Sequence, residues 1–253
     1  MEESKVETRK TVLITGGASG MGLLLGKCYA KEGANVALVD YNKDALDACV
    51  AEIAAYPANI EGFCIDIRNY DKVAEVCAET YEKFGSIDIL INCAGGSEMR
   101  ILGAHGEFHE VPMEVYDFGI DVNLKGAFYF DHAVMKYMAK QMSGVIVHLG
   151  SITGADGSSY DVAYATSKSA LMNGLTSSIA QAGAKYNVRC FCVAPGPVLT
   201  RSAMANMKTL IGRAAEPQEI VDLIMYVASE KGAFITGTTI LADGGRHVMK
   251  NKG

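Results

Sequence analysis

Two side chains spaced for proton transfer stand at Tyr164 and Lys168, in the run Tyr-Ala-Thr-Ser-Lys. On a helix this spacing places both side chains on one face. A free phenol has a pKa of about 10, and a nearby ammonium group favours its ionised form. The pair is therefore suited to general acid and base chemistry near neutral pH, with Tyr164 as the group that moves the proton. Ser151 precedes the pair at the end of a predicted strand.

A glycine-rich turn is the second feature with chemical meaning. The run Thr-Gly-Gly-Ala-Ser-Gly-Met-Gly, residues 15–22, follows an apolar stretch and opens a predicted helix. The amides of such a turn and the positive end of the helix bind pyrophosphate, and glycine lets the backbone approach closely. The spacing of Gly16, Gly20 and Gly22 differs from the commoner Gly-x-Gly-x-x-Gly, so an ordinary turn is the alternative. Its position after the first strand favours dinucleotide binding.

Acidic residues end the next two predicted strands. Asp40 stands where a carboxylate accepts hydrogen bonds from an adenosine ribose, and its charge repels a 2′-phosphate. No Arg or Lys lies in the glycine turn or directly after Asp40, and Lys43 is the only nearby cation. The sequence thus favours NAD over NADP, with a helix cap or turn role as the alternative for Asp40. Asp66 is expected to contact the adenine, and capping of the next helix is the alternative. Ile67 is also expected in the cofactor site.

Strands and helices alternate along the chain, and strands such as Val36–Val39 are continuously apolar, which indicates burial on both faces. We therefore expect one α/β domain, a Rossmann-type doubly wound parallel sheet in a three-layer α/β/α arrangement. The expected domain spans residues 11–246, between a polar extension (1–10) and a tail (247–253). The expected strands are Val12–Thr15, Asn35–Asp40, Ile60–Asp66, Ile87–Asn92, Val145–Leu149, Val188–Val193 and Thr238–Leu241. The expected helices are Met21–Lys31, Asp44–Ala55, Tyr70–Phe84, Met113–Gln141, Ala163–Lys185 and Pro217–Ala228.

Composition excludes several classes of function. The net charge of −6 comes with no basic stripe, which argues against a nucleic-acid partner. The polar N-terminus lacks a secretory signal and no apolar run is long enough for a membrane span, so a cytoplasmic location without membrane contact is expected. The seven Cys show no metal-ligand or Cys-x-x-Cys spacing, and we expect most of them to be reduced and buried. No metal is expected.

The motifs in this order resemble those of the short-chain dehydrogenase/reductase family, in its single-domain branch, over about residues 10–245. Two departures are small: Cys93 replaces a frequent second Asn, and His148-Leu-Gly150 precedes Ser151 where the family often has Asn-x-Ser. Neither removes a catalytic group. The motifs that carry the resemblance are Thr15-Gly-x-x-x-Gly-Met-Gly22, Asn92-Cys-Ala-Gly95, Asn123, Ser151, Tyr164-x-x-x-Lys168 and Pro195-Gly196.

The resemblance implies a role for each motif. Tyr164 would be the acid or base, Lys168 would lower its pKa and bind the nicotinamide ribose, and Ser151 would bind the substrate oxygen. Asn123 would hold a helix kink and a proton-relay water, and the segment from Pro195 to Thr200 would hold the carboxamide, with a plain proline turn as the alternative. The full expected cofactor site is Gly16, Ser19, Gly20, Met21, Gly22, Asp40, Asp66, Ile67, Asn92, Ala94, Gly95, Tyr164, Lys168, Pro195, Gly196, Val198 and Thr200.

The expected activity is NAD-dependent interconversion of a secondary alcohol and a ketone. The alternatives are an NADPH-dependent 3-oxoacyl-thioester reductase and a regulatory protein that binds NAD(H) without turnover. The substrate stays open: segments 96–111 and 202–215 are the variable loops, and the second is expected to form a partly apolar lid. Surface roles are favoured for Arg100, His105, His109 and Arg201, a loop or pocket position for Tyr160, and a structural role for His148. The resemblance also implies a homo-oligomer, a dimer or tetramer.

Overall fold

The computed structural model describes residues 9–250. The predicted extension and tail therefore lie partly outside the described residues, at 1–8 and 251–253. Seven parallel strands form one sheet in the order β3-β2-β1-β4-β5-β6-β7. The strand order reverses between β1 and β4, which is where doubly wound folds bind their ligands. The strands are β1 (Thr11–Thr15), β2 (Asn35–Asp40), β3 (Ile60–Cys64), β4 (Ile89–Asn92), β5 (Gly144–Leu149), β6 (Val188–Pro195) and β7 (Thr239–Ala242).

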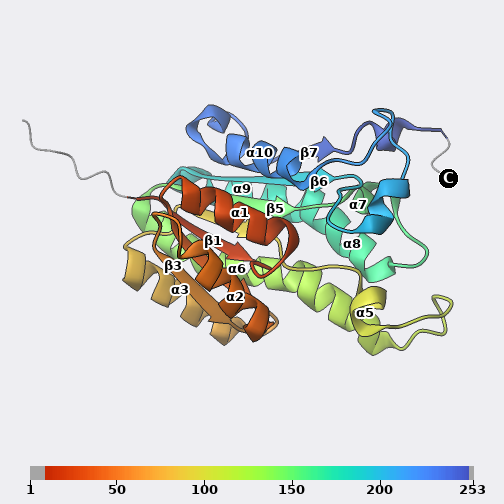
Figure 1. The fold of residues 1–253 in the computed structure, drawn as a ribbon, viewed down its shortest axis with the longest axis horizontal. Coiled ribbons are helices and arrows are strands. Elements are labelled where there is room, and N and C mark those ends of the chain that lie inside the picture. The colour runs from red at the N-terminus through yellow and green to blue at the C-terminus, as the bar shows by residue number, and fades with distance from the viewer. Residues whose placement is uncertain (1–8, 251–253) are drawn as a thin grey trace, which may run out of the picture.

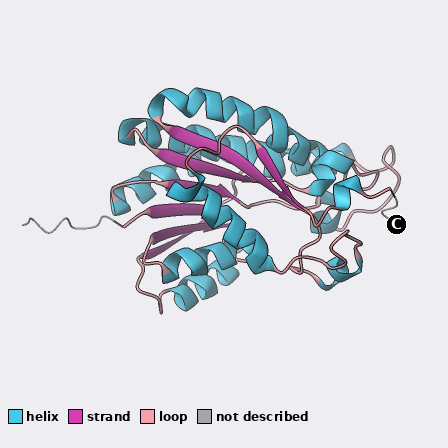
Figure 2. Cartoon of the chain, turned by 90° about the horizontal axis from the view of Figure 1, so that it is seen from above, coloured by secondary structure: helices cyan, strands magenta, loops and turns pink. Residues whose placement is uncertain are grey.

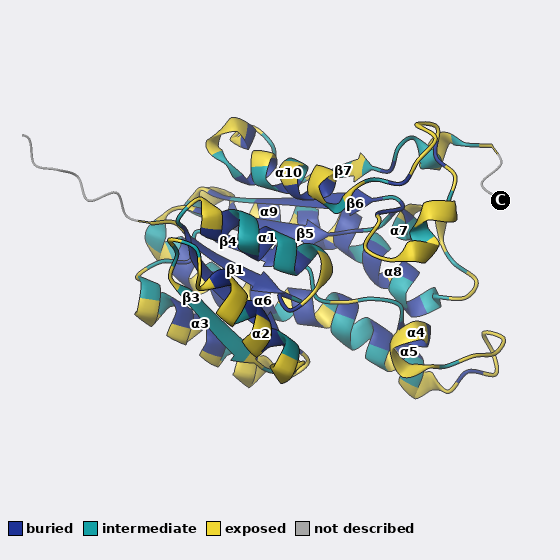
Figure 3. Cartoon of the chain, in the orientation of Figure 1, coloured by how far each residue is buried: buried dark blue, intermediate teal, exposed yellow. Residues whose placement is uncertain are grey.

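Helices cover both faces of this sheet, as Figures 1 and 2 show. Alternate residues of one strand point to opposite faces, so Val12 and Ile14 of β1 pack in one core and Leu13 in the other. The first core is covered by α1 (Gly20–Lys31), α2 (Lys43–Ile53) and α10 (Pro217–Ala228), and the second by α3 (Tyr70–Phe84), α6 (Gly126–Gln141) and α9 (Thr176–Gly183). The predicted three-layer α/β/α fold is confirmed. Figure 3 shows buried central strands between helices whose outer faces are exposed, while the edge strand β3 is only partly buried.

The two long predicted helices both contain a π-helical segment. The first runs from α5 (Met113–Ile120) through η1 (Asp121–Lys125) into α6, and the second runs from α8 (Val162–Ala170) through η2 (Leu171–Leu175) into α9. π segments often mark functional sites. The remaining elements are α4 (Glu98–Leu102), α7 (Ile152–Asp156) and the 3₁₀ turns η3 (Ala184–Tyr186), η4 (Ser202–Asn206), η5 (Glu230–Gly232) and η6 (Arg246–Val248).

Two strands are shorter than predicted, for identifiable reasons. The β3 ladder ends at Cys64 because its partner on β2 is Asp40, the last residue of that strand. Ile87 precedes β4 because its backbone N–H and C=O are both bonded by the amide side chain of Gln141 (2.9 and 3.0 Å). Within the described residues, every helix is too short or too polar to cross a membrane.

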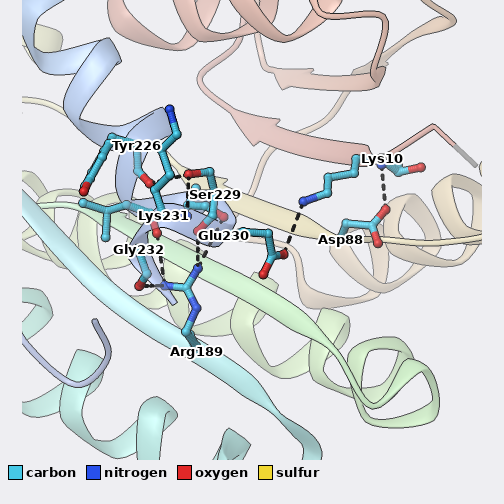
Figure 4. Close-up of polar contacts among 11 residues, drawn as sticks. Lys10, Asp88, Arg189, Tyr226, Ser229, Glu230, Lys231 and Gly232 are labelled. Carbon is cyan, nitrogen blue, oxygen red and sulfur yellow. Dashed lines mark hydrogen bonds and ion pairs between the residues drawn. The ribbon is translucent and has the colours of Figure 1, made fainter. Parts of the chain in front are cut away.

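Arg189 of β6 fastens the end of α10 to the sheet, at the edge opposite the strands' carboxyl ends (Figure 4). Its guanidinium donates to two carbonyl groups in the last turn of α10, where intrahelical donors run out, and to three carbonyl groups that follow the helix. Burial lowers the pKa of Arg189, and the charge of Glu230 opposes that shift. The acceptors are the carbonyl groups of Val227, Ala228, Ser229, Gly232 and Ile235, at 3.0–3.4 Å.

Candidate active site

The glycine turn between β1 and α1 is built for close backbone approach. Gly16 and Gly20 have φ of +66° and +53°, values that favour glycine. A Cβ on Gly22 would overlap the carbonyl of Gly16, so the turn and the helix can pack only with glycine there. A Cβ on Gly20 would meet nothing within 4 Å, so this side of the turn faces open space. The turn therefore presents backbone on its outer side.

The N-terminus of α1 fits an anion. Its first intrahelical bond runs from Leu23 N to Ser19 O, so the amides of Gly20, Met21 and Gly22 have no acceptor within the helix. Ser19 makes no side-chain cap, and the first turn carries no acidic residue. Open amides and the positive end of the helix dipole suit a pyrophosphate. The predicted residues thus lie together in one turn and helix start whose amides suit an anion: Gly16, Ser19, Gly20, Met21 and Gly22.

Asp40 ends β2 beside the glycine turn. Its carboxylate accepts from Ala18 N (3.1 Å) and Asn42 N (3.0 Å), and only 9% of the residue is exposed. The turn role that the sequence left open is therefore present. The cap role is not, because Asn42 caps α2 by accepting from Ala45 N. Two amide donors hold the carboxylate in a fixed orientation.

Asp66 follows β3 and is bound by its neighbour Arg68. The guanidinium donates to both carboxylate oxygens at 2.5–3.0 Å, and these bonds hold the pKa of Asp66 below its ordinary value. The alternative of a helix cap is wrong for Asp66, because Asn69 caps α3 by accepting from Lys72 N. Ile67 is buried beneath the start of α6, where its side chain fills the space next to Gly126.

The residues that follow β4 contact Thr15 at the end of β1 and Asn123 of η1. Thr15 Oγ1 accepts from the amides of Cys93 (3.1 Å) and Ala94 (3.0 Å), which closes the gap between β1 and β4 at the switch point. Gly95 has φ of +140°, and a Cβ there would overlap the Asn123 side chain. Asn92, Ala94 and Gly95, which the sequence predicts in the cofactor site, thus lie at the end of β4 beside Thr15 and Asn123.

Tyr164 and Lys168 lie on one face of α8, as their spacing predicted. The Lys168 ammonium is 5.5 Å from the centroid of the Tyr164 ring and donates to Leu149 O at 2.6 Å. Lys168 is 3% exposed, while Tyr164 is partly exposed. Ser151 follows β5 and caps α7, its Oγ accepting from Thr153 N at 3.2 Å. The structure therefore fixes the ammonium group between the end of β5 and the phenol ring.

Asn123 lies in the π segment η1 and is 1% exposed. Its amide pairs with the backbone of Gly96 in both directions, donating to Gly96 O (2.9 Å) and accepting from Gly96 N (2.8 Å). The same Nδ2 donates to Gly119 O at 2.9 Å. Asn123 thus joins the segment after β4 to its own helical segment, η1.

The segment after β6 packs against the end of β7. Gly196 N donates to Ala242 O at 3.1 Å, and a Cβ on Gly196 would stand 2.7 Å from Asp243 Cα. Pro195 and Val198 are buried, whereas Thr200 is exposed. This backbone borders a cavity of about 200 Å³ that is lined by Pro197, Thr209, Ile211, Arg213, Ala215, Glu219, Ile220, Ala242, Asp243 and Gly244.

A buried polar network joins His148, Asp131, Thr176 and Asn92. Of these, the sequence singled out only His148 and Asn92. His148 bonds to Asp131 Oδ2 (2.9 Å) through Nε2 and to Thr176 Oγ1 (2.8 Å) through Nδ1. Asp131 Oδ1 accepts from Asn92 Nδ2 at 2.9 Å. The predicted structural role of His148 is confirmed. No sequence pattern marked Asp131 or Thr176 as a partner of His148, because they lie 17 and 28 positions away from it.

The variable segments are only partly ordered into helices. Residues 98–102 form α4, and residues 202–206 form η4. Leu210 and Ile211 are exposed at 64% and 69%, so the predicted apolar lid presents side chains to solvent. Tyr160 lies in a loop, bonded to His105 and to Ala104 O. Glu98, which the sequence did not single out, is fully buried.

The described cysteines are unpaired, and four of the seven are buried: Cys49, Cys77, Cys190 and Cys192. Burial raises the pKa of Cys77 to about 12 and that of Cys192 to about 11, which makes both thiols poor nucleophiles. Cys64 is exposed, and Cys28 and Cys93 are intermediate. No group of three His, Cys, Asp or Glu residues within 9–250 is arranged to hold a metal ion.

Comparison with known proteins places this geometry in a family. The short chain dehydrogenase family matches residues 10–210. A 3-oxoacyl-(acyl-carrier-protein) reductase of Thermotoga maritima is 34% identical over 245 residues, which cover 93% of this chain and 97% of that protein. A 7alpha-hydroxysteroid dehydrogenase of Bacteroides fragilis is 32% identical over 246 residues, with 93% of each chain covered.

Solved structures agree with this match. An NAD⁺-bound xylitol dehydrogenase superposes with a TM-score of 0.86 at 25% identity, covering 94% of this chain and 100% of the other. A short-chain type dehydrogenase/reductase from Mycobacterium ulcerans gives the same TM-score and identity, covering 96% and 92%. Both likenesses extend over nearly the whole chain.

Proposed function

Because the chain belongs to the short-chain dehydrogenase family, we propose that it is an NAD(H)-dependent oxidoreductase that interconverts a secondary alcohol and a ketone. The observation that carries this proposal is the position of Lys168, whose ammonium is held by Leu149 O within 5.5 Å of the Tyr164 ring centroid. A buried cation beside a partly exposed phenol is the arrangement that a tyrosine acid or base requires.

The residues divide the work as follows. Tyr164 takes the proton of the alcohol, or returns it to the ketone, while Lys168 keeps a positive charge beside the phenol. Ser151, at the end of β5, donates a hydrogen bond to the substrate oxygen. Asn123 keeps the helix and the segment after β4 in register through its bonds to Gly96 and Gly119. When bound, the nicotinamide supplies the hydride chemistry, and the protein contributes orientation and electrostatics.

The proposed cofactor is NAD. The glycine turn and the α1 N-terminus would bind the pyrophosphate, and the carboxylate of Asp40 would bind the adenosine ribose. Asn92, Ala94 and Gly95 would border that ribose, and the backbone from Pro195 to Thr200 would hold the carboxamide. The NAD⁺-bound xylitol dehydrogenase that superposes on this chain supports the choice.

Replacing Tyr164 with Phe tests the proposal. Steroids, bile acids, polyols and simple ketones are screened with NAD⁺ and NADH, and turnover of the best substrate is followed by NADH absorbance. We expect Tyr164→Phe to lower kcat by about 10³-fold or more, because the proton-transfer group is removed. NADH binding, followed by fluorescence titration, stays close to wild type.

Tyr226→Phe is the matched control, since Tyr226 is an exposed tyrosine on α10, outside the proposed site. It should keep wild-type turnover. Turnover that survives in Tyr164→Phe would refute the assignment of the acid or base. A screen in which no compound is turned over, despite NADH binding, would support the alternative of a regulatory NAD(H)-binding protein.

A second candidate activity is reduction of a 3-oxoacyl thioester. The identity to the reductase of Thermotoga maritima favours it, while the Asp40 carboxylate disfavours the NADPH that this candidate was expected to use. Turnover of acetoacetyl-CoA, measured with NADPH and with NADH, distinguishes this activity from the proposed alcohol oxidation. If acetoacetyl-CoA and NADPH are turned over faster than any alcohol with NAD⁺, the thioester reductase becomes the better assignment.

We propose a homo-oligomer, a dimer or tetramer, as the working assembly. Phe234 on the loop after η5 and Phe128 on α6 are exposed at 104% and 50%, and burial of such side chains between copies is favourable. Light scattering on the purified chain gives the mass of the assembly.

A further inference from the structure

The N-terminus of α8, the helix that carries Tyr164 and Lys168, is not capped by its own N-cap residue. The first amides of a helix have no acceptor within it, and the N-cap side chain usually supplies one. Asp161 is the N-cap of α8, but its side chain makes no cap. Instead it accepts from Ser97 Oγ at 2.5 Å, which binds it to the segment after β4.

Glu98 supplies the missing acceptors from a distant part of the chain. Its Oε1 accepts from Ala163 N at 2.9 Å, and its Oε2 accepts from Tyr164 N at 3.0 Å. The two amides belong to the second and third residues of α8. One of them is the backbone N–H of Tyr164 itself, so this carboxylate contacts the residue that bears the phenol.

The carboxylate is held rigidly because it lies among packed elements. Glu98 has 0% of its surface exposed and sits in α4, which contacts α5, while α5 contacts α8 (Figure 3). A Cβ on Gly119 of α5 would stand 3.0 Å from Glu98 Cβ and 2.8 Å from Ala163 Cβ. The absence of a side chain at Gly119 therefore lets the three helices meet closely around Glu98.

Opposing electrostatic effects act on the Glu98 carboxylate, and burial and the charge of Asp161 both raise its pKa. The N-terminus of a helix carries a partial positive charge, and a carboxylate there is stabilised. The amides of Ala163 and Tyr164 also oppose the rise in pKa. A buried carboxylate is costly unless it is hydrogen-bonded, so the two amides explain how the charge is tolerated.

Three consecutive residues thus attach the segment after β4 to the helices of the site. Gly96 pairs with Asn123, Ser97 donates to Asp161, and Glu98 accepts from Ala163 and Tyr164. We propose that Glu98 is a positioning residue that sets the Tyr164 backbone, and with it the phenol, by capping α8 from the segment after β4. This inference rests on the proposed function, because it assigns Tyr164 as the group that transfers the proton.

Two substitutions of Glu98 test the proposal. Glu98→Gln keeps the shape and one good acceptor oxygen, and Glu98→Ala removes both acceptors. We expect kcat to fall about 3- to 10-fold in Glu98→Gln and about 10- to 100-fold in Glu98→Ala, since small displacements of a reacting group have effects of this size. KM and the dissociation constant of NADH should change by less than about threefold, because Glu98 would act on orientation rather than on binding.

Glu107→Gln is the matched control, the same substitution at an exposed position of the same segment. It should leave kcat, KM and NADH binding at wild-type values. Wild-type kcat in both Glu98 variants would overturn the proposal. So would a proportionate loss of kcat and NADH binding, since that result indicates general disruption of the fold.

Amide hydrogen exchange measures the cap without a substrate. In the full-length chain we expect the amides of Ala163 and Tyr164 to exchange at least about tenfold faster in Glu98→Gln than in wild type or Glu107→Gln. Unchanged exchange at these amides would overturn the inference even if the enzyme is active. Faster exchange in a chain that turns over none of the screened substrates would sustain the cap while refuting the proposed function.

Discussion

At the scale of single residues, Asp40 combines a structural task with the proposed recognition of the cofactor. Its carboxylate is fixed by Ala18 N and Asn42 N, so its remaining lone pairs have a set direction before any ligand arrives. A preorganised acceptor costs less to order on binding than a mobile one. Its negative charge also disfavours the additional phosphate of NADP.

Asp40→Ser should therefore change cofactor preference. We expect the dissociation constant of NADH to rise about 10- to 100-fold, because hydrogen bonds to a charged acceptor are lost. The constant for NADPH should fall, since the repulsion is removed. Fluorescence titration with both cofactors measures these constants, and Asp44→Ser, at an exposed position of α2, is the control. An unchanged ratio of the two constants would contradict the assignment of Asp40.

The sequence predicted residues whose partners are near in the chain or fixed by a known motif. Tyr164 and Lys168 meet on one helix face because four residues make about one turn, and the glycine turn follows its strand directly. Glu98 could not be found this way. Its acceptor role depends on amides 65 and 66 positions away, so it becomes visible only when α4 is packed beside α5 and α8.

At the scale of elements, the apolar runs of the sequence were enough to predict that the strands and helices exist. Where each element ends depends on the hydrogen-bond partners of its terminal residues. Tyr70–Phe84 and Pro217–Ala228 were predicted with both ends as found. The π segments η1 and η2 were not predicted as such, because five-residue changes of helical pitch leave the apolar pattern almost unaltered. The family resemblance did suggest a kink at Asn123, and that residue lies in η1.

The connection between β6 and α10 gives a prediction at this scale. Arg189→Met should lower the free energy of unfolding by about 2–4 kcal/mol, because it removes charged donors from several buried carbonyl groups. Urea unfolding followed by circular dichroism measures the change. Lys231→Met, at an exposed position of η5, is the control and should stay within about 0.5 kcal/mol of wild type. An equal effect of both variants would show that Arg189 does not fasten α10.

At the scale of the whole molecule, the parallel sheet brings segments from distant parts of the chain to one edge. The glycine turn, Ser151 and the segment after β6 follow strands, while Asp40 and Asn92 end strands. Their meeting therefore depends on the complete strand order. The sequence predicted this meeting because carboxyl ends of parallel strands share one edge. The predicted domain limits at residues 11 and 246 stay a prediction.

A cofactor that contacts so many segments at once should stabilise the entire fold. Ligand at about 100 times its dissociation constant adds about 2.7 kcal/mol to the free energy of unfolding. For a chain of this size, that corresponds to a rise in melting temperature of about 5–10 °C. We expect NADH to give this rise, and NADPH at the same concentration to give a clearly smaller one, because Asp40 opposes the 2′-phosphate. Differential scanning fluorimetry with both cofactors, and with ADP-ribose to separate the adenosine half, measures the shifts. An equal or larger shift with NADPH would contradict the choice of NAD and shift the balance towards the thioester reductase.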